Sequence, residues 1–141
     1  LDFVREIIEQ AAIVYDSKKS GILELGGGVP KNTAQQTGPL LDQILKRNDG
    51  GQEYIIQITD ARPDTGGLSG ATLQEGKSWG KIQDSHEGII TVYADATIAF
   101  PILALYVLSN QKERKPKRLY KKIDQLYDKL SRDYFDNPNR D

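Results

Sequence analysis

The chain has 141 residues, and its 19 lysines and arginines balance 20 aspartates and glutamates to a net charge of −1, which argues against electrostatic binding to nucleic acid or an anionic membrane. It has no cysteine and one histidine, which excludes disulfides, thiolate zinc sites, a histidine-based triad and a multi-histidine metal site within the chain, and is compatible with a cytoplasmic location. The length predicts one domain, and because the chain starts at leucine and lacks methionine we expect a fragment or processed piece.

The first expected element is a helix over residues 3–15, where apolar residues recur at steps of three and four and charged residues fill the other face. Residues 22–25 read as a short strand that ends at Gly26, Gly27 and Gly28. Glycines at such a point let the backbone approach a ligand closely, although a tight turn from strand to helix explains them equally well. Their spacing is not the G-x-G-x-x-G pattern of a dinucleotide fingerprint.

A second helix is expected over residues 33–47 and is stopped by the Asn-Asp-Gly-Gly run that follows. Strands are expected at 53–58 and 89–93, and strands separated by helical or long connections favour parallel pairing and an α/β fold. The buried stripe expected for the second helix consists of Leu40, Leu41, Ile44 and Leu45.

Polar groups follow the second and third strands, with Asp60 after one and Asp95 after the other. In an open α/β sheet, ligands bind beyond the carboxyl ends of the strands, so these carboxylates and the glycines are candidate ligand contacts. Capping of a turn or helix is an equally common task for aspartate after a strand.

A long, glycine-rich segment from Thr59 to Ile82 shows no apolar period and contains Lys81 between Trp79-Gly80 and Ile82. Long loops in compact domains often carry function, so Lys81 is the first candidate for chemistry, whereas the simpler interpretation is a surface lysine.

The segment after Asp95 is apolar nearly all round and predicts a buried helix, bent by Pro101 or carrying it in its early turns. It is too short and too interrupted to span a bilayer. The last helix is expected over residues 116–135 with one apolar stripe. The basic cluster at its start fits an acidic partner or, more simply, a solvated face: Lys112, Arg114, Lys115, Lys117, Arg118, Lys121 and Lys122.

Four motifs occur in an order and spacing that resemble the deoxyhypusine synthase family, densely from about Gly21 to Pro101. They are Gly26-Gly27-Gly28-Val29-Pro30-Lys31, Ser69-Gly70-Ala71, Glu75 with Ser78-Trp79-Gly80-Lys81-Ile82, and Val92-Tyr93-Ala94-Asp95-Ala96. The resemblance covers the C-terminal part of that family's longer subunit and is strongest to its bacterial deoxyhypusine synthase-like branch.

The resemblance implies a Rossmann-like parallel sheet with flanking helices, with residues 1–141 forming the C-terminal part of one NAD-binding domain. It implies a homotetramer completed by the rest of the subunit upstream of Leu1. It also implies transfer of an aminobutyl unit from spermidine by way of an imine on an enzyme lysine. The implied roles are Lys81 as nucleophile, Glu75, Trp79, Asn32 and Gly66 as substrate contacts, and Gly27, Asp60, Ala61, Asp95 and Ala96 as NAD contacts, with no metal.

The implied lysine chemistry fits the residues, because an attacking amine must be neutral and apolar neighbours such as Trp79 and Ile82 would disfavour its charged form. Two positions depart from the family pattern. Asn32 stands where the eukaryotic enzymes have histidine, and Leu68 stands where an acidic residue holds the polyamine, with Asp64 as a candidate replacement. The alternatives are therefore a homospermidine synthase-type enzyme and an inactive NAD- or polyamine-binding module.

Overall fold

The computed structural model describes residues 2–47, 51–82 and 88–136, so the expected helix stop at residues 48–50, His86 and the tail from residue 137 lie outside the described residues. The helices and strands, in chain order, are α1 (Phe3–Asp16), β1 (Gly21–Leu25), α2 (Val29–Gln35), α3 (Thr37–Pro39), β2 (Tyr54–Thr59), α4 (Leu73–Ser78), β3 (Ile89–Tyr93), α5 (Ala96–Asn110) and α6 (Ile123–Phe135). Shorter helical turns occur at Leu40–Ile44, Pro63–Thr65, Leu68–Gly70 and Leu119–Lys121.

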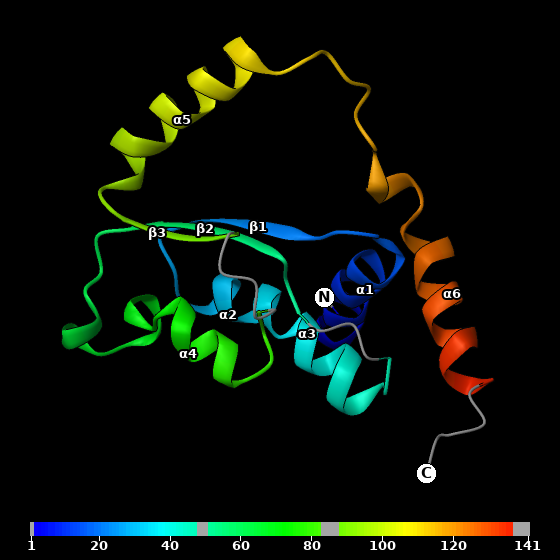
Figure 1. Cartoon of the computed structure of the whole chain (residues 1–141). Coiled ribbons are helices and arrows are strands. Elements are labelled where there is room, and N and C mark those ends of the chain that lie inside the picture. Colours follow the sequence, from blue (N-terminus) through cyan, green and yellow to red (C-terminus); the bar gives the residue numbers. More distant parts are fainter. Residues whose placement is uncertain (1, 48–50, 83–87, 137–141) are drawn as a thin grey trace.

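The three strands form one parallel sheet in the order β1-β2-β3, which confirms the predicted α/β class and parallel pairing (Figure 1). Each connection between neighbouring strands passes through helices, α2 and α3 in the first case and α4 in the second. Parallel neighbours require such crossovers. All the carboxyl ends of the strands therefore meet at one edge of the sheet, as the sequence analysis expects.

The two faces of the sheet have different surroundings. One face is covered by α2, α3 and α4, and there Ile55 of β2 packs with Leu73 of α4 and Ile82 (Figure 1). The opposite face carries two cross-strand rows of apolar residues, Leu23, Ile56 and Ile90 in one and Leu25, Ile58 and Val92 in the other. Leu23, Leu25, Ile90 and Val92 remain exposed, so much of this apolar face is uncovered in the described chain.

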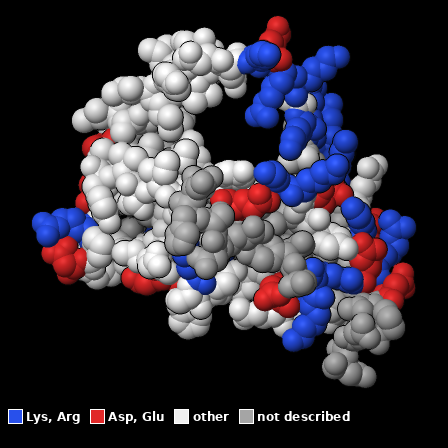
Figure 2. Space-filling model, in the orientation of Figure 1, with Lys and Arg blue, Asp and Glu red and all other residues white. Residues whose placement is uncertain are grey.

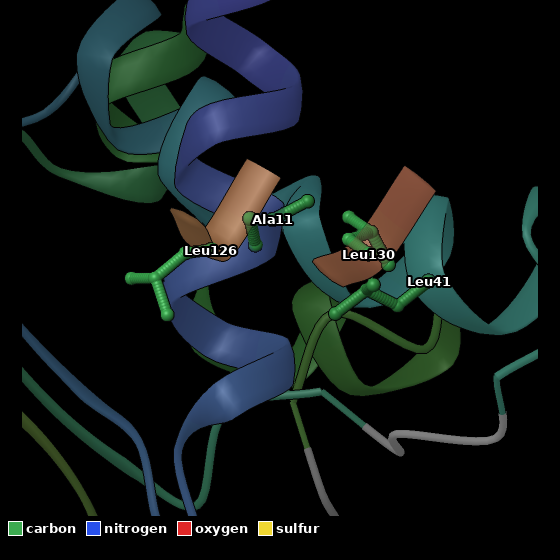
Figure 3. Close-up of a cluster of buried hydrophobic side chains, with 5 residues drawn as sticks. Ala11, Leu41, Leu126 and Leu130 are labelled. Carbon is green, nitrogen blue, oxygen red and sulfur yellow. The ribbon is translucent and has the colours of Figure 1, made fainter. Parts of the chain in front are cut away.

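A second core lies beside the sheet where α1, the Leu40–Ile44 turn and α6 meet (Figure 3). Ala11 and Ala12 of α1 let the other two elements approach closely, and Leu126 and Leu130 of α6 pack against them and Leu41. Exposed ion pairs surround this core, among them Arg5 to Asp124 at 2.6 Å and Lys129 to Asp16 at 2.6 Å. The predicted amphipathic stripes of the first and last helices are confirmed. The predicted start of the last helix at residue 116 is wrong, because Arg118 has a left-handed φ of +48° and the chain makes a separate turn at Leu119–Lys121 before α6 begins at Ile123.

The expected helix over residues 33–47 differs from the structure. The helical segment begins earlier, at Val29, because Pro30 suits the first turn of a helix, and it is interrupted at Gln36 between α2 and α3. Its last part is a π-helical turn in which Leu41 is buried, whereas Ile44 is 65% exposed. The change of helical pitch rotates Ile44 away from the core, so its predicted burial is wrong.

The expected burial of the helix after Asp95 is also wrong for this chain. α5 includes Pro101 in its interior, lies on the uncovered side of the sheet and contains no buried residue (Figure 1). Leu105 and Leu108 are 68% and 69% exposed, because no other described element packs over the helix. No helix within the described residues is long and apolar enough to cross a membrane.

Residues 111–118, between α5 and the turn before α6, are all exposed. Figure 2 shows Lys and Arg side chains gathered at the upper right, where this run lies in Figure 1. The basic cluster therefore forms a solvated face in the chain as described.

Candidate functional site

Lys81 lies just after α4, and its backbone is fixed on both sides. Its N–H donates to the Gly76 carbonyl at 3.0 Å, and its own carbonyl accepts from the Gln52 N–H at 3.1 Å. Gly80 has a φ of +70°, a left-handed conformation that favours glycine and turns the chain back after the helix. The two backbone hydrogen bonds and the turn at Gly80 fix the position of the Lys81 backbone. Lys81 is therefore not a lysine on a mobile loop.

α4 is the part of the long glycine-rich segment that sequence periodicity missed. A capping box begins it: the Glu75 N–H donates to Thr72 Oγ1 at 3.2 Å, and Glu75 Oε1 accepts from the Thr72 N–H at 3.5 Å. The Thr-x-x-Glu spacing is itself a signal for a helix start and could have predicted this element.

Four of the proposed catalytic and substrate residues line one cavity of about 200 Å³, namely Lys81, Asn32, Glu75 and Trp79. The Lys81 ammonium donates to Asn32 Oδ1 at 2.7 Å, which joins α2 to the segment after α4 across 49 positions of sequence. Leu68 also lines this cavity. Neither Gly66 nor Asp64 does, so Asp64 does not take the place of the missing acid at Leu68 in this structure.

The inner wall of the cavity contains a buried polar cluster that carries no role in the sequence analysis. Lys31 is 7% exposed and its ammonium donates to the Ala71 carbonyl at 2.7 Å. Behind it, Gln35 Nε2 donates to Glu24 Oε1 at 2.6 Å. Lys31 and Gln35 are one helical turn apart on α2, and this i, i+4 spacing could have predicted that they lie on the same side of a helix.

Burial shifts both charged members of this cluster toward their neutral forms. Burial lowers the pKa of Lys31, and Lys81 lowers it further, while the carboxylates of Glu24 and Glu75 oppose the shift. Burial raises the pKa of Glu24, against the Gln35 hydrogen bond and the charge of Lys31. Glu24 Oε2 has no hydrogen-bond partner among the described residues, which adds to the cost of its charged form.

The apolar cover expected around Lys81 differs from the structure. Trp79 is 68% exposed, and Ile82 packs into the core with Ile55 and Leu73. Because Trp79 is largely exposed and Ile82 lies in the core, neither side chain encloses the Lys81 amine here. The exposed indole of Trp79 instead forms part of the cavity lining.

A separate and larger cavity of about 640 Å³ lies at the carboxyl ends of β2 and β3. Asp60 and Ala94 line it, together with Tyr93 and the pair Arg62 and Asp64, whose side chains are joined by two hydrogen bonds of 3.1 Å. It is the hollow that the strand-end rule for α/β sheets predicts.

Asp95 is the N-cap of α5. Its Oδ1 accepts from both the N–H and the hydroxyl of Thr97 at 2.7 Å, and these bonds lower the pKa of the carboxyl. The capping interpretation therefore holds for Asp95, and the neighbouring Ala96 is the first residue of the helix. Asp60 caps no helix in the described chain, while the Ala61 N–H donates to Thr59 Oγ1 at 3.1 Å.

The predicted glycines have different surroundings. A Cβ on Gly27 would lie 2.8 Å from the Ser69 Cα, so packing against the Ser69 loop alone requires glycine there. Gly66 has a φ of +70°, and an added Cβ would meet nothing within 4 Å. Gly66 therefore serves a turn in this structure and lies outside both cavities.

Comparison with known proteins gives consistent matches. The family model described as deoxyhypusine synthase matches residues 1–107. A deoxyhypusine synthase-like protein of Nostoc sp. is 47% identical over 139 residues, which cover 95% of this chain and 36% of that protein. A probable deoxyhypusine synthase 2 of Archaeoglobus fulgidus is 42% identical over 120 residues, or 82% of this chain and 38% of that protein. The chain thus spans little more than a third of the length of these relatives.

Proposed function

The chain belongs to the deoxyhypusine synthase family, and from this premise we propose that the full-length protein is an NAD-dependent aminobutyl transferase that acts on a polyamine such as spermidine. Lys81 is the proposed nucleophile, and Glu75, Trp79, Asn32 and Gly66 are the proposed substrate contacts. The observation that carries the proposal is the cavity in which Lys81 meets Asn32, Glu75 and Trp79. These side chains come from two segments that are far apart in the sequence, so the tertiary fold and not local structure brings them together.

Each cavity residue has a chemistry suited to an amine substrate. The exposed Trp79 ring offers a π face to an ammonium group. Glu75 Oε2 makes no hydrogen bond within the described residues, and so that oxygen remains able to accept from a second ammonium group. Gly66 stays a proposed contact only if the 66–68 turn moves toward the cavity.

Lys81 supplies the amine for group transfer. NAD would supply the hydride acceptor for oxidation of the substrate amine to a C=N bond and the hydride donor for reduction of the final imine. The Lys81 nitrogen forms a bond to the carbon of that C=N bond, the original C–N bond breaks, and the diamine part leaves with a proton. The aminobutyl group then remains on Lys81 as an imine until an acceptor amine displaces the lysine.

The cavity at the carboxyl ends of β2 and β3 is the proposed position for NAD. Asp60 is exposed at its wall, and a Cβ added to Gly26 would meet nothing within 4 Å, so the backbone at the end of β1 is open to a ligand. Of the proposed contacts Gly27, Asp60, Ala61, Asp95 and Ala96, only Asp60 lines this cavity as described. The helices that cross between parallel strands support the proposal of a Rossmann-like half, and a dinucleotide crevice normally needs two such halves. We therefore propose that further sequence upstream of Leu1 supplies the second half. We also propose that the protein is a homotetramer in the cytoplasm.

Leu68 favours a second candidate function within the same chemistry. It lines the lysine cavity at the position where the family resemblance leads one to expect an acid. An apolar wall suits a substrate with fewer charges at that end, so the alternative within this chemistry is a homospermidine synthase-type reaction on another polyamine. An inactive NAD- or polyamine-binding module is the alternative outside enzymes.

Borohydride reduction of the full-length protein incubated with NAD and labelled spermidine tests the proposal. We expect a stable adduct on Lys81, located by peptide mass spectrometry. Lys81→Ala and Lys81→Arg should both abolish it, because alanine has no amine and a guanidinium stays protonated. Lys115→Ala, in the exposed basic run, is the control and should retain it. Tight spermidine binding without any adduct would instead support the inactive module.

A further inference from the structure

The hydrogen bond between Lys81 and Asn32 has a defined direction. A lysine ammonium only donates, so its acceptor here is the amide oxygen of Asn32 and not the amide nitrogen. The bond is 2.7 Å long and partly buried. Asn32 itself is held in α2, where its N–H donates to the Gly28 carbonyl at 3.0 Å and its carbonyl accepts from the Gln36 N–H at 2.9 Å. Lys81 is thus tied to a fixed point.

The kind of acceptor matters to a nucleophilic amine. A carboxylate at this distance would stabilise the ammonium form and oppose attack, and a histidine would change charge near neutral pH. An amide oxygen accepts one N–H bond and carries no charge. When the amine is neutral and gives one N–H bond to Asn32, its lone pair cannot point at Asn32 and takes one of the two remaining positions around the nitrogen.

We propose that Asn32 is a positioning residue for Lys81, which orients the lysine nitrogen through one uncharged hydrogen bond and keeps its lone pair from pointing at Asn32. This role rests on the transferase function proposed above and is additional to any contact between Asn32 and substrate. Among the described residues, the other charged groups at the cavity are Lys31 on α2 and Glu75 on α4, with Glu24 near Lys31. The ammonium of Lys31 is bonded to Ala71, so it does not compete for Asn32.

The first experiment measures the amine directly, without polyamine or NAD. The full-length protein is labelled with a trace of acetic anhydride between pH 6 and 11, and mass spectrometry compares Lys81 with exposed Lys115. Asn32→Asp keeps the shape but adds a negative charge, so it should shift the labelling profile of Lys81 upward by about one pH unit or more. The matched control Gln36→Asp, exposed one turn later, should leave the profile in place.

The second experiment measures orientation. Asn32→Ala removes the acceptor, so the rate of borohydride-trapped adduct formation from saturating spermidine and NAD should fall at least tenfold, whereas Gln36→Ala should match the wild type. In Asn32→Ala the pH profile of Lys81 labelling should not move upward, since no charge is added. A structural role alone would change the melting temperature but not separate these two variants of Asn32.

The outcomes distinguish this proposal from the transferase function. If Asn32→Asp leaves the Lys81 profile unchanged, or Asn32→Ala traps adduct at the wild-type rate, the positioning role is wrong. If the labelling shifts as expected but the wild type forms no spermidine adduct, Asn32 still holds Lys81 and the transferase function fails instead.

Discussion

Asp95 occupies a strand end where two roles are possible, and the structure gives it one of them. Its carboxylate caps α5 through two bonds to Thr97. Asp95→Ala should therefore lower hydrogen-exchange protection in the first turn of α5 roughly fivefold, the usual effect of losing a cap. Asp95→Asn should restore most of that protection, because asparagine caps as well as aspartate does.

The same two variants test the proposed NAD contact. If Asp95 also binds the cofactor through its charge, both variants should weaken NAD binding measured by calorimetry on the full-length protein. If the wild type and both variants bind NAD with equal affinity, Asp95 is not an NAD contact and only caps α5.

Glu24 should make the stability of the protein depend on pH. Its pKa is raised in the folded state, so the folded protein binds the proton more tightly than the unfolded chain does. Stability linked to this group is thus fully present below the ordinary glutamate pKa and is lost as the pH rises through the raised value. Glu24→Gln removes that dependence and still accepts the Gln35 bond. Its stability relative to wild type, from urea unfolding at successive pH values, should increase from acid toward neutral pH. A constant difference across that range would contradict this prediction.

At the scale of elements, the periodicity of apolar residues predicted the helices and strands that pack on one side. β1, β2, β3 and α1 appear close to their expected bounds, and α6 ends where expected but begins seven residues late, at Ile123 and not at residue 116. α4 was missed because six residues hold too little periodicity, although its capping box was visible in the sequence. The meeting of Asn32 with Lys81 was beyond local rules, since 49 positions separate them and only the crossover geometry brings them together. The exposure of Trp79 likewise depends on neighbours that a sequence does not specify.

The π-helical turn at Leu40–Ile44 gives the element-level prediction. Leu41 is fully buried there, so Leu41→Ala should lower the free energy of unfolding by about 2–5 kcal/mol through lost contacts and a cavity. Ile44→Ala, three residues on, should change it by less than about 0.5 kcal/mol, as exposed positions usually do. Urea unfolding of the full-length variants measures both. A large loss from Ile44→Ala would mean that another surface covers it in the whole protein.

At the scale of the whole molecule, α5 and the open face of the sheet leave many large apolar side chains exposed, and a contiguous apolar surface normally marks an interface. Residues 1–141 produced alone should therefore self-associate at micromolar concentration in sedimentation velocity and bind NAD weakly. The double variant Ile102→Glu with Leu105→Glu should reduce the association, and Ser109→Glu, exposed on the same helix, is the control. A monodisperse wild-type monomer that binds NAD tightly would contradict this expectation.

The packing of α6 on α1 also sets the order of events during protein synthesis. Arg5 and Asp124 are in contact but 119 positions apart, and at about 5–20 residues per second a ribosome needs roughly 6–24 s to add the residues between them. Throughout that interval Ala11, Ala12 and Leu41 have no α6 to cover them. The nascent chain therefore presents an unfinished apolar surface that a co-translational chaperone would have time to bind, until Leu126 and Leu130 leave the exit tunnel and close the core.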